Sequence, residues 1–333
     1  MNDYSGSVYH HPAPEPLHLV KTEPERLRRP APTNPHHSPA PGGQAKADSL
    51  HDAQKSSMPA TPPVLVPANH PIRVREILSH TSGLPFKSTA QPGALDLLPL
   101  KEAVRSFAAE PLEFQPGTDY AYSNEGLNTA ARIIEVVSGM PYEQLMQERL
   151  FTPLGMKDTT FWPTAEQLHR LAKTYKADER TKDLIELSIN QLTYPLDDRQ
   201  HRYPMPAGGL FSTAEDVLKF CQMILHGGTL NGKQYITAKS LHEMTSRQNG
   251  SLGGKEYGLG WTVSKDSIGH GGAFKNGMEI WIPEGRILIF MVQQDGPWGS
   301  LAGEAIMPTL ERMSRDFPSG SGERGVNAAP VKH

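Results

Sequence analysis

The sequence predicts an α+β fold, in which a block of helices precedes a block of antiparallel strands. Residues 127–137 carry apolar side chains three and four positions apart, as one face of a helix requires, and this spacing recurs over 217–225. From Tyr257 onward short apolar segments alternate with turns, which is typical of strands. Helices followed by strands, without internal repeats, indicate segregated elements rather than alternating βαβ units.

The composition divides the chain into three parts. Residues 1–62 contain nine prolines between positions 12 and 41 and few large apolar residues, so they bury too little surface to offset their ordering entropy. We expect this segment to be disordered. Residues 63–315 hold the predicted helices and strands and form one domain, and residues 316–333 form a flexible tail rich in Gly and Ser.

Charge and cysteine usage exclude several classes of function. The chain of 333 residues has a formal net charge of −3, which gives no footprint for nucleic acid or an anionic membrane surface, and no apolar run reaches the length of a membrane span. The single cysteine, Cys221, excludes an internal disulfide and a cysteine-based metal cluster, and its apolar helical context predicts a buried, inert thiol. The first thirty residues lack the apolar core of a secretory signal, so the localisation stays unknown.

The first half of the domain is predicted to be helical. A polar turn from Ser79 to Leu84 and a Pro-Gly turn before Tyr122-Ser123-Asn124 interrupt the helices. Ser138-Gly139 ends the third helix, and a fourth stops before Pro153. The expected helices are 72–78, 95–107, the segment from the Tyr122 turn to Ser138, and 142–150.

The second half begins with a long excursion. Residues 160–205 contain several X-Pro pairs and are predicted to be mostly irregular. A long loop of this kind either forms a wall of a binding site or is simply an insertion. Ser212-Thr213-Ala214-Glu215 predicts a capping box that starts a helix ending at Gly227-Gly228. The remaining expected elements are a helix over 238–246, strands over 257–263, 267–271, 278–282 and 287–293, and a helix over 302–313.

Seven short segments carry a joint signal that none of them carries alone. They are Ile77-Leu78-Ser79-His80-Thr81-Ser82-Gly83-Leu84, Phe114-Gln115-Pro116-Gly117, Tyr122-Ser123-Asn124, Pro153-Leu154-Gly155-Met156, Pro206-Ala207-Gly208-Gly209-Leu210-Phe211-Ser212-Thr213, Tyr257-Gly258-Leu259-Gly260-Trp261 and His270-Gly271-Gly272-Ala273. In this order the chain resembles the serine β-lactamase and penicillin-binding-protein family, in particular its class C and esterase-like branch. The resemblance covers roughly Pro63 to Met313 and implies a β-lactamase/transpeptidase-like fold with a C-terminal helix flanking the sheet.

The resemblance implies two catalytic residues. Tyr122 would relay a proton between the nucleophile and the leaving group, which requires nearby cations to lower its pKa. His270 takes the place of the lysine in the family's K-T-G motif and would assist Tyr122 electrostatically or carry a proton. The implied reaction is acyl transfer through a serine ester, followed by hydrolysis.

The resemblance also implies substrate-binding residues. Asn124 would hold the substrate amide or orient a lysine, and Gly271 and Gly272 would keep the strand edge open to a ligand. The N–H of Ala273 would supply half of an oxyanion hole. The implied partner is a small acyl substrate, namely a β-lactam, an ester or a peptidoglycan-like D-amino-acid peptide. The histidine favours esters and D-amino-acid peptides, and no metal or organic cofactor is implied.

The family's nucleophile motif, S-x-x-K, is absent: no serine of the chain has a lysine three positions later. The resemblance places that motif several tens of residues before His80, on a central helix preceded by an N-terminal helix and strands, where this chain has its proline-rich segment. We therefore expect a truncated hydrolase that is inactive as written.

Three explanations stay open for the missing motif. The recorded start of the chain is wrong or frame-shifted, or the chain is a non-catalytic binding or scaffold protein, or it uses another serine such as Ser82 or Ser123. His80 and Ser82 are expected to be structural, as are Trp261 and Trp281, which we place in the core.

Overall fold

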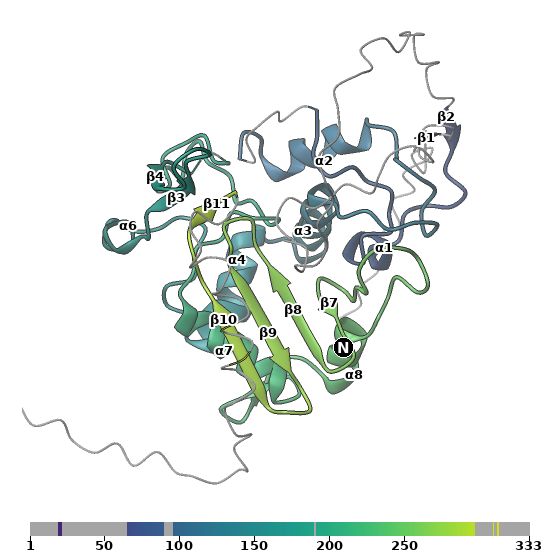
Figure 1. Cartoon of the computed structure of the whole chain (residues 1–333). Helices are drawn as coiled ribbons and strands as arrows, with labels where there is room; N and C mark the ends of the chain where they lie inside the picture. Colours follow the sequence, from purple (N-terminus) through teal and green to yellow (C-terminus); the bar gives the residue numbers. More distant parts are fainter. Residues whose placement is uncertain are drawn as a thin grey trace, which may run out of the picture.

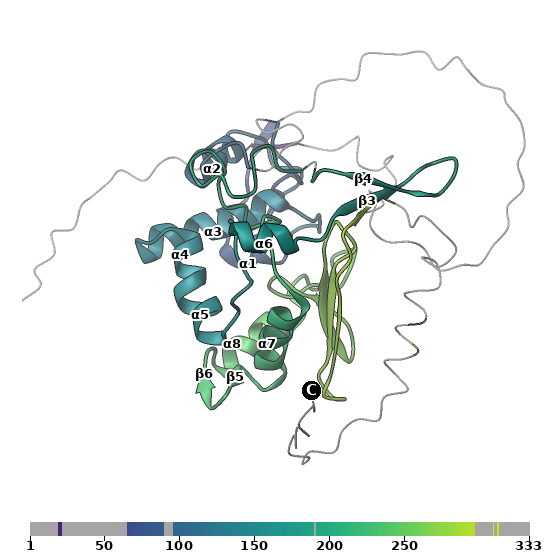
Figure 2. The same cartoon turned by 90° about the vertical axis from the view of Figure 1, so that its left-hand side faces the viewer.

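The computed structural model describes residues 19–21, 65–89, 96–189, 191–296, 309 and 312. It shows the expected α+β fold (Figure 1): helices come first in the chain and the main antiparallel sheet comes last. In the side view the sheet is seen nearly edge-on, with α7 and α8 on one side of it (Figure 2).

Three helices build the block that carries the Tyr122 turn. They are α1 Val74–Leu78, α2 Leu100–Ala108 and α3 Asn124–Ser138, and both α1 and α2 pack on α3. α3 begins after Ser123, whose side chain accepts the N–H of Gly126, and ends at Gly139 with φ 68°. α2 starts at Leu100 rather than at 95, because Pro99 is its N-cap.

The next helical segment is longer than predicted. α4 Tyr142–Met146 continues through a π-helical turn, η2 Gln147–Phe151, into α5 Thr152–Leu154. The predicted stop before Pro153 is wrong, because this proline lies in the first turn of α5, where its missing N–H costs little. Gly155, with φ 70°, ends the segment instead.

The excursion after residue 160 contains more regular structure than predicted. It holds α6 Ala165–Arg170, β3 Thr174–Ala177 and β4 Leu184–Leu187, and β3 and β4 form an antiparallel hairpin. A capping box between Thr164 and Gln167 starts α6, a signal that is present in the sequence and was missed. The short strand β11 Gln294–Asp295 pairs parallel with β3.

α7 Ala214–Leu225 packs on the main sheet through β9 and β10. Its N-cap is Thr213, whose side chain accepts the N–H of Asp216, rather than Ser212. The short hairpin of β5 Thr229–Leu230 and β6 Lys233–Gln234, which was not predicted, connects α7 to α8 Ala238–Thr245.

The main sheet has the order β10-β9-β8-β7, and every pair is antiparallel. Its strands are β7 Thr262–Val263, β8 Ser267–Gly271, β9 Gly277–Trp281 and β10 Arg286–Phe290. The predicted hairpin of the last two strands is confirmed. The predicted strand 257–263 is wrong except at its end, because the chain turns at Gly260, with φ 80°, and folds Tyr257 back against Thr262.

The core between α7 and the sheet contains Cys221, Ile224, Trp261 and Ile280, so the predicted burial of Cys221 and of Trp261 is confirmed. Burial raises the pKa of the Cys221 thiol to about 12, as an inert thiol requires. Trp281 is only partly buried, with the Arg286 guanidinium over its ring.

Strand β1 Leu19–Lys21 pairs antiparallel with β2 Leu65–Pro67, although its residues lie in the segment where we expected disorder. Burial of Val20 against Leu84 and Leu112 accounts for this strand. The predicted helix 302–313 lies outside the described residues apart from positions 309 and 312, which are helical. None of the described helices is long and apolar enough to cross a membrane.

Candidate active site

The candidate site lies where the N-terminus of α3 meets the end of β8. The hydroxyl of Tyr122 is 3.4 Å from Nε2 of His270, although 148 positions separate the two residues in the chain. Asn124 is the first residue of α3 and follows Tyr122 by two positions in the chain. The structure thus brings together Tyr122 and His270, as the sequence analysis expected.

A second tyrosine, Tyr257, belongs to this site and was missed. Its hydroxyl lies 2.9 Å from Nε2 of His270, and the residue is 1% exposed. Its ring centroid is 4.7 Å from that of His80 and 6.4 Å from that of Tyr122. Tyr257 opens one of the seven recognised segments, but we assigned it to a strand, where it would have had no chemical role.

His80 is buried inside this aromatic group and fixes the Tyr122 turn, as its expected structural role requires. Its carbonyl oxygen accepts the N–H of Ala121 at 3.0 Å, and its Nδ1 accepts the N–H of Ser123 at 3.1 Å. The backbone of His80 is left-handed, with φ 58°, a conformation that histidine adopts more readily than most residues. The ring lies over Tyr122, with centroids 4.1 Å apart.

The protonation state of His80 follows from these contacts. Burial, reinforced by His270, lowers its pKa to about 3, so the ring is neutral at pH 7. Because Nδ1 accepts a hydrogen bond, the proton lies on Nε2, a buried atom with no partner in the described part of the chain.

The tyrosines of the site are protonated phenols. Burial raises the pKa of Tyr122. The pKa of Tyr120 is raised to about 12, mainly by burial and to a smaller extent by its electrostatic interaction with Tyr122. The expected proton relay through a Tyr122 phenolate needs cations that lower the pKa of this tyrosine, whereas burial raises it. The Tyr122 hydroxyl is therefore a hydrogen-bond donor rather than a phenolate base.

The turn after β8 offers space and a free backbone donor. Gly271 and Gly272 are exposed, and a Cβ at either position would meet nothing closer than 3.6 Å. The fold itself therefore does not require glycine at these positions, which fits the expected role of an edge left open to a ligand. Gly272 donates its N–H to Asn276 O, whereas the N–H of Ala273 has no partner among the described residues.

Neither candidate serine is available as a nucleophile. Ser123 caps α3 and donates its hydroxyl to Pro85 O at 2.7 Å, and Ser82 accepts the N–H of Leu84. Each is 1% exposed or less. A reactive serine needs an adjacent base and access to substrate, and these two have neither.

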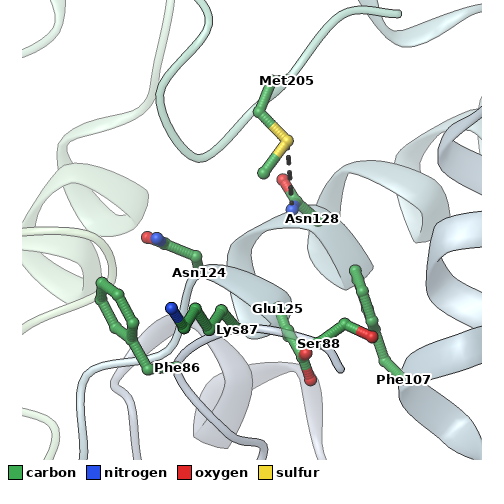
Figure 3. Close-up of a pocket in the computed structure, with 8 residues that line it drawn as sticks. All are labelled: Phe86, Lys87, Ser88, Phe107, Asn124, Glu125, Asn128 and Met205. Carbon is green, nitrogen blue, oxygen red and sulfur yellow. Dashed lines mark hydrogen bonds between the residues drawn. The ribbon is translucent and has the colours of Figure 1, made fainter. Parts of the chain in front are cut away.

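A small pocket lies beside the site on the α3 side (Figure 3). It is lined by Phe86, Lys87, Ser88, Phe107, Asn124, Glu125, Asn128 and Met205. Asn124 therefore connects the two places: it follows Tyr122 closely in the chain, and its side chain lines this pocket. No group of three His, Cys, Asp or Glu that could hold a metal occurs in the described ranges.

The family model described as Beta-lactamase matches residues 55–309. The chain belongs to the beta-lactamase family. The match runs through the Tyr122 turn and β8, the two segments that meet at the candidate site. Family members are hydrolases that act on small acyl substrates.

Two relatives illustrate the breadth of the family. Protein Rv1367c of Mycobacterium tuberculosis H37Rv is 29% identical over 223 residues, which are 60% of this chain and 53% of that protein. An Escherichia coli K12 protein named "Putative D-alanyl-D-alanine carboxypeptidase" is 26% identical over 207 residues, 58% of this chain and 47% of that protein. The chain thus spans about half the length of these relatives.

Solved structures of the same family share the fold. The one described as EstCE1, a hydrolase with promiscuous acyltransferase activity, superposes with a TM-score of 0.60 at 21% identity. The superposition covers 74% of this chain and 72% of that one.

Proposed function

We propose that the Tyr122–His270 site binds small acyl compounds, with esters and D-amino-acid peptides preferred over β-lactams. The proposal rests on one observation above the others: the hydroxyls of Tyr257 and Tyr122 lie 2.9 and 3.4 Å from His270, beside an open turn whose Ala273 N–H has no partner among the described residues. This arrangement offers a phenol and an imidazole for proton transfer and a backbone donor for a carbonyl oxygen. The printed names of the E. coli relative and of EstCE1 support this substrate class.

We further propose that the chain binds these compounds reversibly and does not form an acyl-enzyme. None of its serines belongs to an S-x-x-K motif, and Ser82 and Ser123 are buried in a turn and a helix cap. Tyr122 in its protonated form would then orient a carbonyl substrate rather than activate an attacking hydroxyl.

The test separates binding from turnover. The purified chain is mixed with nitrocefin, p-nitrophenyl acetate and a fluorescent penicillin, and a shift of its melting temperature reports reversible binding. A D-amino-acid peptide is tested in the same way. We expect ligand-dependent stabilisation with the ester or with this peptide, no covalent fluorescent label and no nitrocefin turnover. A second sample, with a helix bearing Ser-x-x-Lys fused ahead of Pro63, should gain esterase activity.

The matched variants are Tyr122→Phe and Tyr235→Phe. Tyr122→Phe removes the site hydroxyl, and Tyr235→Phe removes a hydroxyl bonded to Pro153 O. Only the first should weaken ligand binding. Covalent labelling of the unmodified chain would refute the non-catalytic proposal, and no stabilisation by any of the acyl compounds would refute the binding site itself.

A further inference from the structure

The carboxyl group of Glu125 is buried in the pocket without a partner. The residue is 1% exposed, and neither of its carboxyl oxygens has a hydrogen-bond partner among the described residues. Buried carboxyl groups are almost always paired or hydrogen-bonded, so an unpaired one in a pocket requires an explanation. In Figure 3 this carboxyl lies beside Ser88.

The polar groups that share the pocket are bonded elsewhere. Ser88 donates its hydroxyl to Glu110 at 2.8 Å. The Asn128 amide nitrogen donates to the Met205 sulfur at 3.4 Å, and its oxygen accepts the N–H of Ala207 at 3.1 Å. The remaining neighbours, Phe107 and Met205, bring apolar surface. The carboxyl of Glu125 is thus a buried acceptor of this pocket without a hydrogen-bond partner in the described part of the chain.

The surrounding charges favour a cation at this place. Burial raises the pKa of Glu125, and the charges of Glu110 and Glu113 raise it further, to about 8. In Figure 3 the side chain of Lys87 runs towards Asn124 rather than towards this carboxyl. A positive charge bound beside Glu125 would therefore relieve both the unpaired acceptor and the repulsion from two neighbouring carboxylates.

We propose that the Glu125 pocket is a subsite for a protonated primary amine of the acyl ligand. This proposal rests on the proposed function, because Asn124 lines the pocket and joins it to the Tyr122–His270 site. An ammonium group is compact and has three donors, two of which the free carboxyl oxygens can accept. A metal ion fits less well, since no ligating group of three occurs in the described residues. The implied ligands are amino-acid amides, esters or peptides with a free amine.

Binding of such an amine changes the protonation of the pocket. Near pH 7 the carboxyl of Glu125 is mainly protonated, because its pKa is about 8, and it must ionise to pair with an ammonium group. Each binding event then releases close to one proton to the buffer. Affinity should rise with pH towards about 8 and fall above it, because the α-amine of the ligand then loses its own proton.

Titration calorimetry of the whole chain tests the proposal with two probes, D-alaninamide and N-acetyl-D-alaninamide. The two differ only in the availability of the amine. We expect D-alaninamide to bind at least tenfold more tightly at pH 7.5, with proton release measured as a difference between buffers of unequal ionisation enthalpy. The acetylated probe should release no proton.

Two variants assign the effect to Glu125. Glu125→Gln keeps the size of the side chain and should abolish both the tenfold preference and the proton release. Glu113→Gln removes only a neighbouring charge, so the preference should persist while proton release near pH 7 becomes smaller. Melting curves confirm that both variants are folded.

The outcomes separate this proposal from the proposed function. Equal binding of the two probes, or an unchanged preference in Glu125→Gln, overturns the amine subsite and leaves the acyl site intact. Binding of neither probe overturns the amine subsite, and the acyl site falls with it only if the esters also fail to stabilise the chain.

Discussion

The hydroxyl of Tyr257 lies 2.9 Å from Nε2 of His270. The hydroxyl of Tyr122 lies 3.4 Å from the same nitrogen, so the shorter contact belongs to the residue outside the recognised Tyr-Ser-Asn motif. One imidazole nitrogen makes one strong hydrogen bond at a time. Tyr257 therefore makes the stronger hydrogen bond to His270, and Tyr122 makes the longer and weaker one.

Replacing Tyr257 with phenylalanine tests this division. We expect the free energy of unfolding to fall by about 1 kcal/mol, because one buried hydrogen bond is lost. The nitrogen chemical shift of the His270 side chain should also change. The control is Tyr120→Phe, whose ring stands 5.9 Å from Tyr257 and whose hydroxyl does not contact His270. An unchanged His270 signal in Tyr257→Phe would contradict the assignment.

Substitution of His80 should be costly for stability. His80→Ala removes a fully buried ring and leaves the Ser123 N–H unpaired, so we expect a loss of about 2–4 kcal/mol in denaturant titrations. His80→Asn keeps a side-chain acceptor and tolerates the left-handed backbone, and should cost clearly less. If the two variants were equally unstable, packing alone would explain the burial of His80.

Two buried groups give the chain a stability maximum in mildly acidic solution. The pKa of Glu125 is raised from 4.5 to about 8, so stability falls as pH rises between these values. The pKa of His80 is lowered from 6.5 to about 3, so stability falls as pH drops between these values. Each slope is about 1.4 kcal/mol per pH unit, and the two oppose each other between pH 4.5 and 6.5.

Unfolding free energies measured from pH 3 to pH 9 check this prediction. The Glu125→Gln variant should lose the decline above pH 6.5, and His80→Asn should lose part of the decline below pH 4.5. A profile that keeps its alkaline decline in Glu125→Gln would show that another group is responsible.

The buried pair of Arg202 and Asp96 should be essential for folding. Both side chains are 0% exposed, with Nε and Oδ2 3.6 Å apart. Because Arg202→Met leaves Asp96 buried without its counter-charge, we expect a loss of about 3–5 kcal/mol. Arg170→Met, which breaks an exposed pair with Asp158, should cost no more than about 1 kcal/mol and serves as the control.

The sequence predicted those parts of the fold that local signals determine. The 127–137 apolar stripe, the Gly139 stop and the final hairpin are confirmed because each depends on residues close in the chain. The segment 160–205 was less predictable, since β3, which pairs with β4, also pairs with β11, more than a hundred residues away. The capping box of α6 was visible in the sequence and overlooked.

The site was predictable only in part for a similar reason. Family segments pointed to Tyr122 and His270, and the fold brings them together. Tyr257 lies in a family segment but was assigned to a strand, and Glu125 gave no such signal, because a glutamate in a first helical turn is common on surfaces. Their burial depends on contacts with distant residues, which no local pattern contains.

The hydrogen bonds of Arg202 have a consequence for the evolution of this protein. Besides its ion pair with Asp96, its guanidinium donates to the main-chain carbonyl oxygens of Phe161, Leu196 and Gly209. These hydrogen bonds stabilise the backbone of the segment 160–205 through main-chain atoms, so they do not depend on the identity of most side chains in that segment. Mutations can exchange most of those side chains one at a time, while a single arginine keeps the loop in place.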